Sequence, residues 1–264
     1  MPSDAAEQPC VVCGTPTSQR CSCCAQRGIG LFFCSRAHQK LASVAQVWSA
    51  HKLVCSKDPD ALLPPLSDDE IEDAKARMHQ PLRCEGGRVS TLARDVQVLC
   101  KRPLPEVLSS LPGPIFGSSE PPFKPLLTLM IRSSRLASFA APLDVTASYG
   151  TPVVFLLAST YVEHALFALH DARLLLSSSP AAGRLDAQSW FIPLLHRALV
   201  LGALELVALS RSNALRECPE YVAGLESMQR WVRAGMGTDG EAFRQALKGV
   251  DFAVGRVNYH APAR

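Results

Sequence analysis

Side chains that can bind a metal ion crowd the start of the chain. Seven of the ten cysteines lie within the first 55 residues, together with two histidines. These donors form four close pairs, two separated by two residues and two separated by three. In order along the chain, the candidate ligands are Cys10, Cys13, Cys21, Cys24, Cys34, His38, His51 and Cys55.

The spacing within these pairs suits tetrahedral zinc. A two-residue gap lets a tight turn bring two thiolates to one ion, and a three-residue gap places donors at i and i+4 on one face of a helix. Eight donors fill two four-coordinate sites and leave no open position for a catalytic water, so we expect two structural Zn²⁺ ions per chain. The alternative is a set of free, buried cysteines. Of the three neighbouring cysteines Cys21, Cys23 and Cys24, only Cys21 and Cys24 are separated by two residues, so they are the preferred pair. Cys23 is then a spare thiol or a competing ligand.

The strings CVVC, CSCC, FCSRAHQK and WSAHKLVC resemble the MYND-type zinc finger, over Cys10 to Cys55. His38 stands where that family more often has Cys, and the stretch from Gln39 to Trp48 is longer than the family pattern. The resemblance implies a cross-braced pairing of the ligands. One ion would bind Cys10, Cys13, Cys34 and His38, and the other would bind Cys21, Cys24, His51 and Cys55.

The resemblance also implies a protein-interaction module that binds short peptides containing Pro and Leu. Gln39 and Trp48 match the residues that line the peptide groove in that family. A proline-rich ligand fits physically, because its backbone is already extended and an aromatic ring offers it a flat apolar surface. For Trp48 the alternative is a core position over the zinc-binding helix.

Composition narrows the partners and the compartment. The formal net charge is only +3, and no long block of Lys or Arg occurs, so we expect no nucleic-acid partner. Residues 1–9 are polar and resemble no secretory signal, so they are interpreted as a flexible N-terminus of an intracellular protein, nuclear or cytoplasmic. In that setting metal binding explains the cysteines better than disulfides do.

Residues 56–121 are predicted to be an acidic, proline-rich linker with short helices. Asp58 to Asp73 holds seven acids and no Lys or Arg, which we interpret as a solvated linker and helix face. Ser67 and Glu70 form a capping-box pattern that opens a helix toward Met78, and Ser90 is a candidate cap for a helix over 91–100. The prolines of 102–121 predict an exposed loop. The proline motifs of 103–125 resemble finger ligands, so self-binding is one hypothesis and an inert loop is the other.

The rest of the chain, 122–260, is predicted to be a helical bundle, which makes the fold class a small zinc-stabilised finger followed by an all-α region. Apolar segments rich in Ala and Leu predict helices, and no strand-like alternation occurs. The predicted helices are 123–140, 152–176, 187–211, 219–234 and 239–258.

No catalytic motif accompanies these helices. The MYND resemblance raises the question of a methyltransferase, but Asn258 to His260 lacks the following cysteine of that signature, and no glycine-rich phosphate loop occurs. We therefore expect a non-enzymatic adaptor or regulator, with the helical region a candidate for self-association. The alternatives are an unrecognised helical enzyme and membrane association through the apolar helices. His196, Arg197 and Glu205 argue against membrane association, because these polar residues interrupt the longest apolar segment.

Overall fold

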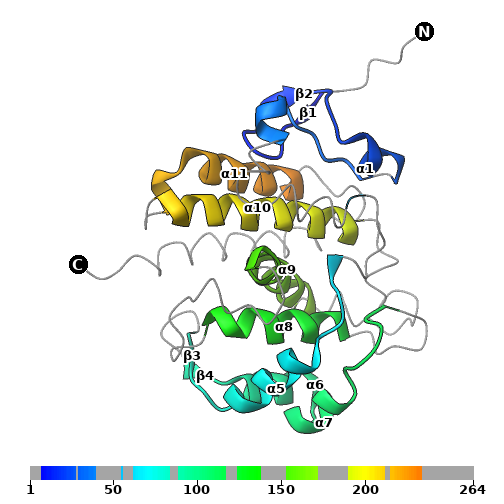
Figure 1. The fold of residues 1–264 in the computed structure, drawn as a ribbon, viewed down its shortest axis with the longest axis vertical. Helices are drawn as coiled ribbons and strands as arrows, with labels where there is room; N and C mark the ends of the chain where they lie inside the picture. The colour runs from blue at the N-terminus through cyan, green and yellow to red at the C-terminus, as the bar shows by residue number, and fades with distance from the viewer. Residues whose placement is uncertain are drawn as a thin grey trace.

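A cysteine-rich unit lies at one end of the molecule, and layers of helices follow beneath it (Figure 1). The computed structural model describes nine stretches of the chain. They are residues 7–27, 29–39, 55, 62–83, 89–116, 124–137, 153–171, 190–211 and 215–233.

The cysteine-rich unit contains only short elements. Strand β1 (Gln8–Pro9) pairs antiparallel with β2 (Pro16–Thr17), and helix α1 (Ser22–Gln26) follows. A second small hairpin, further along the chain, joins β3 (Leu82–Arg83) to β4 (Val89–Ser90). A two-residue strand is too short to show the alternation of apolar and polar residues by which a strand is recognised in a sequence, so neither hairpin could be predicted.

Three short helices follow the finger at the opposite end of the molecule (Figure 1). They are α5 (Asp68–Arg77), α6 (Leu92–Cys100) and α7 (Leu104–Ser109). The predicted capping box is confirmed, because Ser67 and Glu70 exchange hydrogen bonds between side chain and backbone in both directions. The cap of α6 is Thr91 rather than Ser90, since the Thr91 hydroxyl accepts from the backbone N–H of Arg94 at 3.2 Å.

The prediction of an exposed loop over 102–121 is wrong for residues 104–109, which form α7, whereas residues 110–116 lack regular secondary structure and 117–121 lie outside the described residues. Pro103 stands just before α7 and Pro105 lies within its first turn, where a missing N–H costs no helical hydrogen bond. The apolar residues between the prolines are 1–3% exposed and join the core. They are Leu104, Val107, Leu108, Leu111 and Ile115. The segment α7 also lies at the far end of the molecule from the cysteine-rich unit, away from where self-binding would place it (Figure 1).

Four longer helices form the helical region, and α9 lies between α8 and α10 (Figure 1). They match the first four predicted helices to within a few residues in the described part of the chain, whereas the fifth, 239–258, lies outside the described residues. Their bounds are α8 (Lys124–Ala137), α9 (Val153–Asp171), α10 (Phe191–Arg211) and α11 (Pro219–Arg233), with a 3₁₀ turn, η3 (Leu215–Glu217), before the last.

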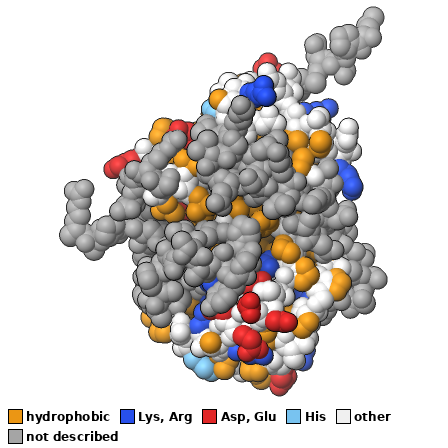
Figure 2. Space-filling view, in the orientation of Figure 1, with side chains coloured by type: hydrophobic (Ala, Val, Ile, Leu, Met, Phe, Trp, Pro, Cys, Tyr) orange, Lys and Arg blue, Asp and Glu red, His pale blue; other side chains and the backbone are white. Residues whose placement is uncertain are grey.

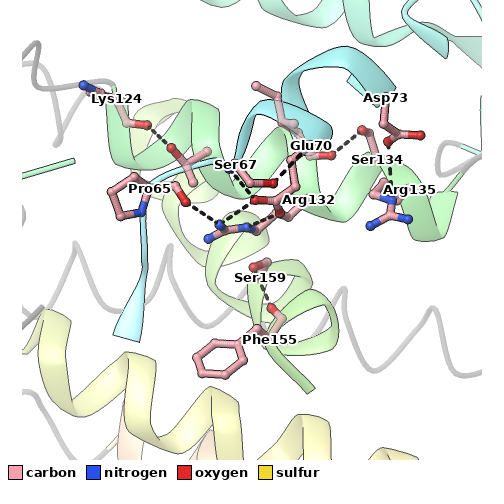
Figure 3. A network of polar contacts seen from close by, with 12 residues as sticks. Pro65, Ser67, Glu70, Asp73, Lys124, Arg132, Ser134, Arg135, Phe155 and Ser159 are labelled. Carbon is pink, nitrogen blue, oxygen red and sulfur yellow. Dashed lines mark hydrogen bonds and ion pairs between the residues drawn. The ribbon is translucent and has the colours of Figure 1, made fainter. Parts of the chain in front are cut away.

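The acidic segment is not simply a solvated face. Glu70 is 2% exposed, and its carboxylate accepts two hydrogen bonds from the Arg132 guanidinium, at 2.9 and 3.1 Å (Figure 3). Asp73 pairs with Arg77 on its own helix and with Arg135 of α8. Only the other side of α5 is solvated, and acidic side chains gather on the surface in that part of the molecule (Figure 2).

Helix α10 is long and apolar enough to cross a bilayer by length and composition alone. Its candidate span, Phe191–Leu209, is 72% buried within the protein, as is usual for a core helix. The polar groups that interrupt this span also have partners. Arg197 donates to the carbonyl of Gly30 at 3.0 Å, and Glu205 accepts from the Tyr161 hydroxyl at 2.7 Å.

Candidate metal centre

Four of the predicted ligands converge in what we call the first cluster, Cys10, Cys13, Cys34 and His38. Their donor atoms all lie within 4.8 Å of one another. The Sγ atoms of Cys13 and Cys34 are 3.5 Å apart, and His38 Nδ1 lies 3.1 Å from Cys34 Sγ and 3.7 Å from Cys10 Sγ. Residues from two distant pairs thus meet at one point.

Local structure explains how the first cluster forms. The β1–β2 hairpin closes around Cys10 and Cys13, and the backbone N–H of Gly14 donates to the Cys10 carbonyl at 2.8 Å. Gly14 has φ +73°, in the left-handed region that favours glycine. On the other side of the cluster, Ser35 accepts from the backbone N–H of His38 at 3.1 Å, at the start of the helical turn 36–39. The turn of helix brings His38 back to Cys34.

The second cluster comprises Cys21, Cys24 and Cys55. Cys55 Sγ lies 3.5 Å from Cys21 Sγ and 3.7 Å from Cys24 Sγ, and all three sulfurs lie within 4.8 Å of one another. Cys21 precedes α1 and Cys24 lies within it, so the helix supplies the tight turn that the two-residue gap predicts. The fourth predicted ligand, His51, lies outside the described residues.

The donor sets fit a tetrahedral metal ion. At a metal–sulfur distance of roughly 2.3 Å, tetrahedral geometry puts two ligand sulfurs about 3.8 Å apart and a sulfur and an imidazole nitrogen about 3.6 Å apart. The observed separations of 3.1–3.7 Å lie close to these values. All seven cysteines of this region are free thiols rather than disulfides. Both clusters could therefore hold a metal ion, and sulfur and imidazole donors suit Zn²⁺ among others.

Burial and the closeness of the thiols to one another both shift the pKa values of these cysteines. Burial, followed by the nearby Cys13 and Cys10 sulfurs, raises the pKa of Cys34 to about 12. The pKa of Cys55 is raised in the same way, by burial and by Cys21 and Cys24. The pKa of Cys13 is lowered, because burial, which raises it, is outweighed by hydrogen bonds with Thr15, Cys34 and Cys10 together. A cation would reverse the rise at Cys34 and Cys55, since it favours the thiolate.

The remaining predicted residues fall in different places. Cys23 is exposed and belongs to neither cluster, although it lies beside Cys24 in α1. Gln39 is half-buried directly after His38, and its N–H donates to the Ser35 carbonyl at 3.0 Å. Trp48 lies outside the described residues.

The cysteine-rich unit, called the finger below, packs directly on α10 and α11. This contact was not predicted from the sequence. Val11, Val12 and Leu31 share one hydrophobic cluster with residues of both helices. Arg197 of α10 reaches the Gly30 carbonyl while its guanidinium lies 4.5 Å from the centre of the Trp231 ring. Burial lowers the pKa of Arg197 to about 9, which still leaves it charged at neutral pH.

Sequence reasoning missed these contacts because they join residues far apart in the chain. The one local signal was the pair Val11 and Val12, because two apolar residues in a tight turn tend to be buried against another part of the protein.

Comparison of the chain with known protein families, curated proteins and solved structures finds no match.

Proposed function

We propose that the chain is a zinc-binding protein-interaction module, an adaptor or regulator whose finger holds two structural Zn²⁺ ions. The observation that carries the proposal is the convergence of the two clusters from pairs distant in the sequence. The first cluster unites donors up to 28 positions apart, and the second unites Cys21 with Cys55. His51 would complete the second site, and the metal would supply much of the folding free energy of a unit with so few regular elements.

Metal analysis of the purified full chain tests the first half of the proposal. We expect two zinc ions per chain in the wild type and about one in Cys24→Ser, which removes a donor of the second cluster. The matched control is Cys23→Ser, one position away in the same helix but exposed and outside both clusters. A wild-type chain with one ion or none, or a Cys23→Ser chain that loses metal as Cys24→Ser does, contradicts the assignment.

The second half of the proposal is that the finger binds proline-containing peptides. Support comes from the MYND resemblance and from the position of Gln39, which is half-buried beside a ligand of the first cluster. A metal-bound helical turn is a rigid platform, and a rigid platform lowers the entropic cost of ordering a peptide. An extended proline-rich segment has little entropy of its own to lose.

Fluorescence polarisation of a labelled proline- and leucine-containing peptide tests the peptide site. We expect Gln39→Ala and Trp48→Ala to weaken binding to the metal-loaded full chain while its metal content stays at two ions. The control is Gln97→Ala, an exposed glutamine of α6 at the other end of the molecule. Equal affinity of all three variants, or no binding by the wild type, overturns the peptide assignment without affecting the metal assignment.

A further inference from the structure

Helix α11 forms a hydrogen bond to the turn that carries Cys10 and Cys13. Ser227 Oγ donates to the Cys10 carbonyl at 2.9 Å, and both residues are 0% exposed. The same carbonyl accepts from the N–H of Gly14 within the turn. The carbonyl of Cys10, a candidate metal ligand, therefore accepts one hydrogen bond from its own turn and one from a helix residue 217 positions later in the chain.

Gly224 lies one helical turn before Ser227, where α11 packs against α10. A Cβ at this position would lie 2.5 Å from Leu204 Cδ1 of α10 and 3.7 Å from the Val12 carbonyl. Val12 itself, in the turn between the two cysteines, is 1% exposed. The absence of a side chain lets α11 pack closely against Leu204 of α10, and the same face of α11 lies in contact range of the turn of the first cluster.

We propose that Ser227 is a positioning residue for the first cluster, so that α11 and a metal ion bound there stabilise each other. The inference rests on the proposed metal binding. Its physical basis is that the hydrogen bond fixes the peptide plane of Cys10 and with it the direction in which the thiolate points. Without that bond, the metal must order the turn on binding, and its affinity falls.

The expected size of the effect is modest. Groups that hydrogen-bond to the metal-ligating atoms themselves change metal affinity about 10- to 100-fold when removed. Ser227 holds the backbone of Cys10 rather than its sulfur, and Gly14 still bonds the same carbonyl. We therefore expect Ser227→Ala to weaken metal binding at the first cluster about three- to tenfold. Linkage requires the metal to stabilise α11 by the corresponding factor.

The experiment uses Co²⁺ as the probe, because its thiolate charge-transfer absorption reports each occupied site. Full-length chains carrying Cys24→Ser isolate the first cluster, and chains carrying Cys13→Ser isolate the second. Ser227→Ala is introduced into each background, and Co²⁺ affinity is measured by competition with a chelator. We expect weaker binding in the Cys24→Ser background and unchanged binding in the Cys13→Ser background.

The matched control is Ser159→Ala in α9. Ser159 is also buried, at 4% exposed, but its hydroxyl donates to the Phe155 carbonyl of its own helix at 2.6 Å. We expect this variant to leave both affinities unchanged. Should the doubly substituted chain not fold, Ser227→Ala in the otherwise wild-type chain gives the same test, as faster Co²⁺ loss from one of the two sites.

Equal affinity with and without Ser227→Ala in the Cys24→Ser background overturns the inference, as does an equal loss at both clusters, which indicates general destabilisation. Either result leaves the proposed metal binding intact if the wild type still holds two ions. A wild-type chain that binds no metal overturns the proposed function instead, so the two failures are distinguishable.

Discussion

The finger and the helical region are held together by different means. In the described part of the finger, regular elements are two to five residues long, and the side chains that converge are thiols and an imidazole. The helical region has elements of 14 to 21 residues and an apolar core, and Arg132 of α8 forms a buried ion pair with Glu70 of α5. The comparison teaches that the two units are built on different side chains: clustered thiols and an imidazole that could hold metal ions in one, and an apolar core with a buried ion pair beside it in the other.

The largest effect that separates the two regions is expected from removing the metal. Structural zinc in finger peptides contributes roughly 10–16 kcal/mol of apparent binding free energy. We therefore expect chelation to raise amide hydrogen exchange throughout residues 7–39 while α8 and α9 keep their protection. Hydrogen exchange followed by mass spectrometry makes the measurement region by region.

Protonation gives the same experiment a pH dependence. In the metal-free protein the raised pKa of Cys34, about 12, and the raised pKa of Cys55 keep these thiols protonated at neutral pH. Metal binding must displace those protons, so chelation should become easier as the pH falls. Equal exchange in residues 7–39 before and after chelation would contradict the dependence of the finger on metal.

Outside the cysteine-rich unit, the largest loss is expected at the buried pair of Glu70 in α5 and Arg132 in α8. Arg132→Met leaves a carboxylate buried without its partner, which costs about 3–5 kcal/mol of unfolding free energy. Adding Glu70→Gln removes that charge while an amide can still make the capping bond to the Ser67 N–H. We expect the double variant to be more stable than Arg132→Met alone, as measured by urea unfolding.

The control for this pair is an exposed one on the same helix. Lys75 and Glu72 are 2.6 Å apart, but their side chains are 46% and 69% exposed. Lys75→Ala should change the unfolding free energy by less than about 1 kcal/mol, because water screens the pair. A loss at Lys75 as large as that at Arg132 would show that burial does not distinguish the two pairs.

The sequence predicted what depends on local spacing. Three features follow from residues a few positions apart: the capping box at Ser67, the bounds of α8 to α11 to within a few residues, and the convergence within the three ligand pairs that the structure describes in full, Cys10 with Cys13, Cys21 with Cys24 and Cys34 with His38. It did not predict that Glu70 would be buried, because Arg132 lies 62 positions away and an acidic run looks the same whether solvated or paired. The contacts of Ser227 and Arg197 with the finger were not predicted either, because they also join residues far apart in the sequence.

A smaller effect is expected at a polar cluster between α9, α10 and α11. The Tyr161 hydroxyl donates to Glu205 and lies 2.6 Å from the Tyr221 hydroxyl, which donates to it in turn because Tyr161 has only one proton. Tyr161→Phe removes a bond to a carboxylate and should cost about 1.5–3 kcal/mol, whereas Tyr221→Phe removes a neutral bond and should cost about 1 kcal/mol. Equal losses would contradict this order of donation.

The same cluster predicts an alkaline limit to stability. Burial, followed by Glu205, raises the pKa of Tyr161 and of Tyr221 above the ordinary value of 10.0. Above about pH 10 the unfolded chain therefore loses tyrosine protons that the folded chain keeps, so the unfolding free energy falls as the pH rises. Below that pH the contribution is fully present. Tyr161→Phe should flatten the fall, and an unchanged slope would count against the cluster as its source.

The smallest effect is expected at the cap of α5. Ser67→Ala removes the acceptor for the Glu70 N–H, a bond of 3.2 Å, and should lower the unfolding free energy by about 1 kcal/mol. The loss should stay local, because Arg132 continues to hold the Glu70 carboxylate from α8.

The matched variant is Thr91→Ala at the cap of α6, where a single side-chain bond to the backbone of Arg94 is lost. In urea unfolding, both variants should shift the midpoint by similar small amounts at an unchanged slope, with no change in metal content. A Ser67→Ala loss near that of Arg132→Met would mean that the cap, rather than the ion pair, positions Glu70.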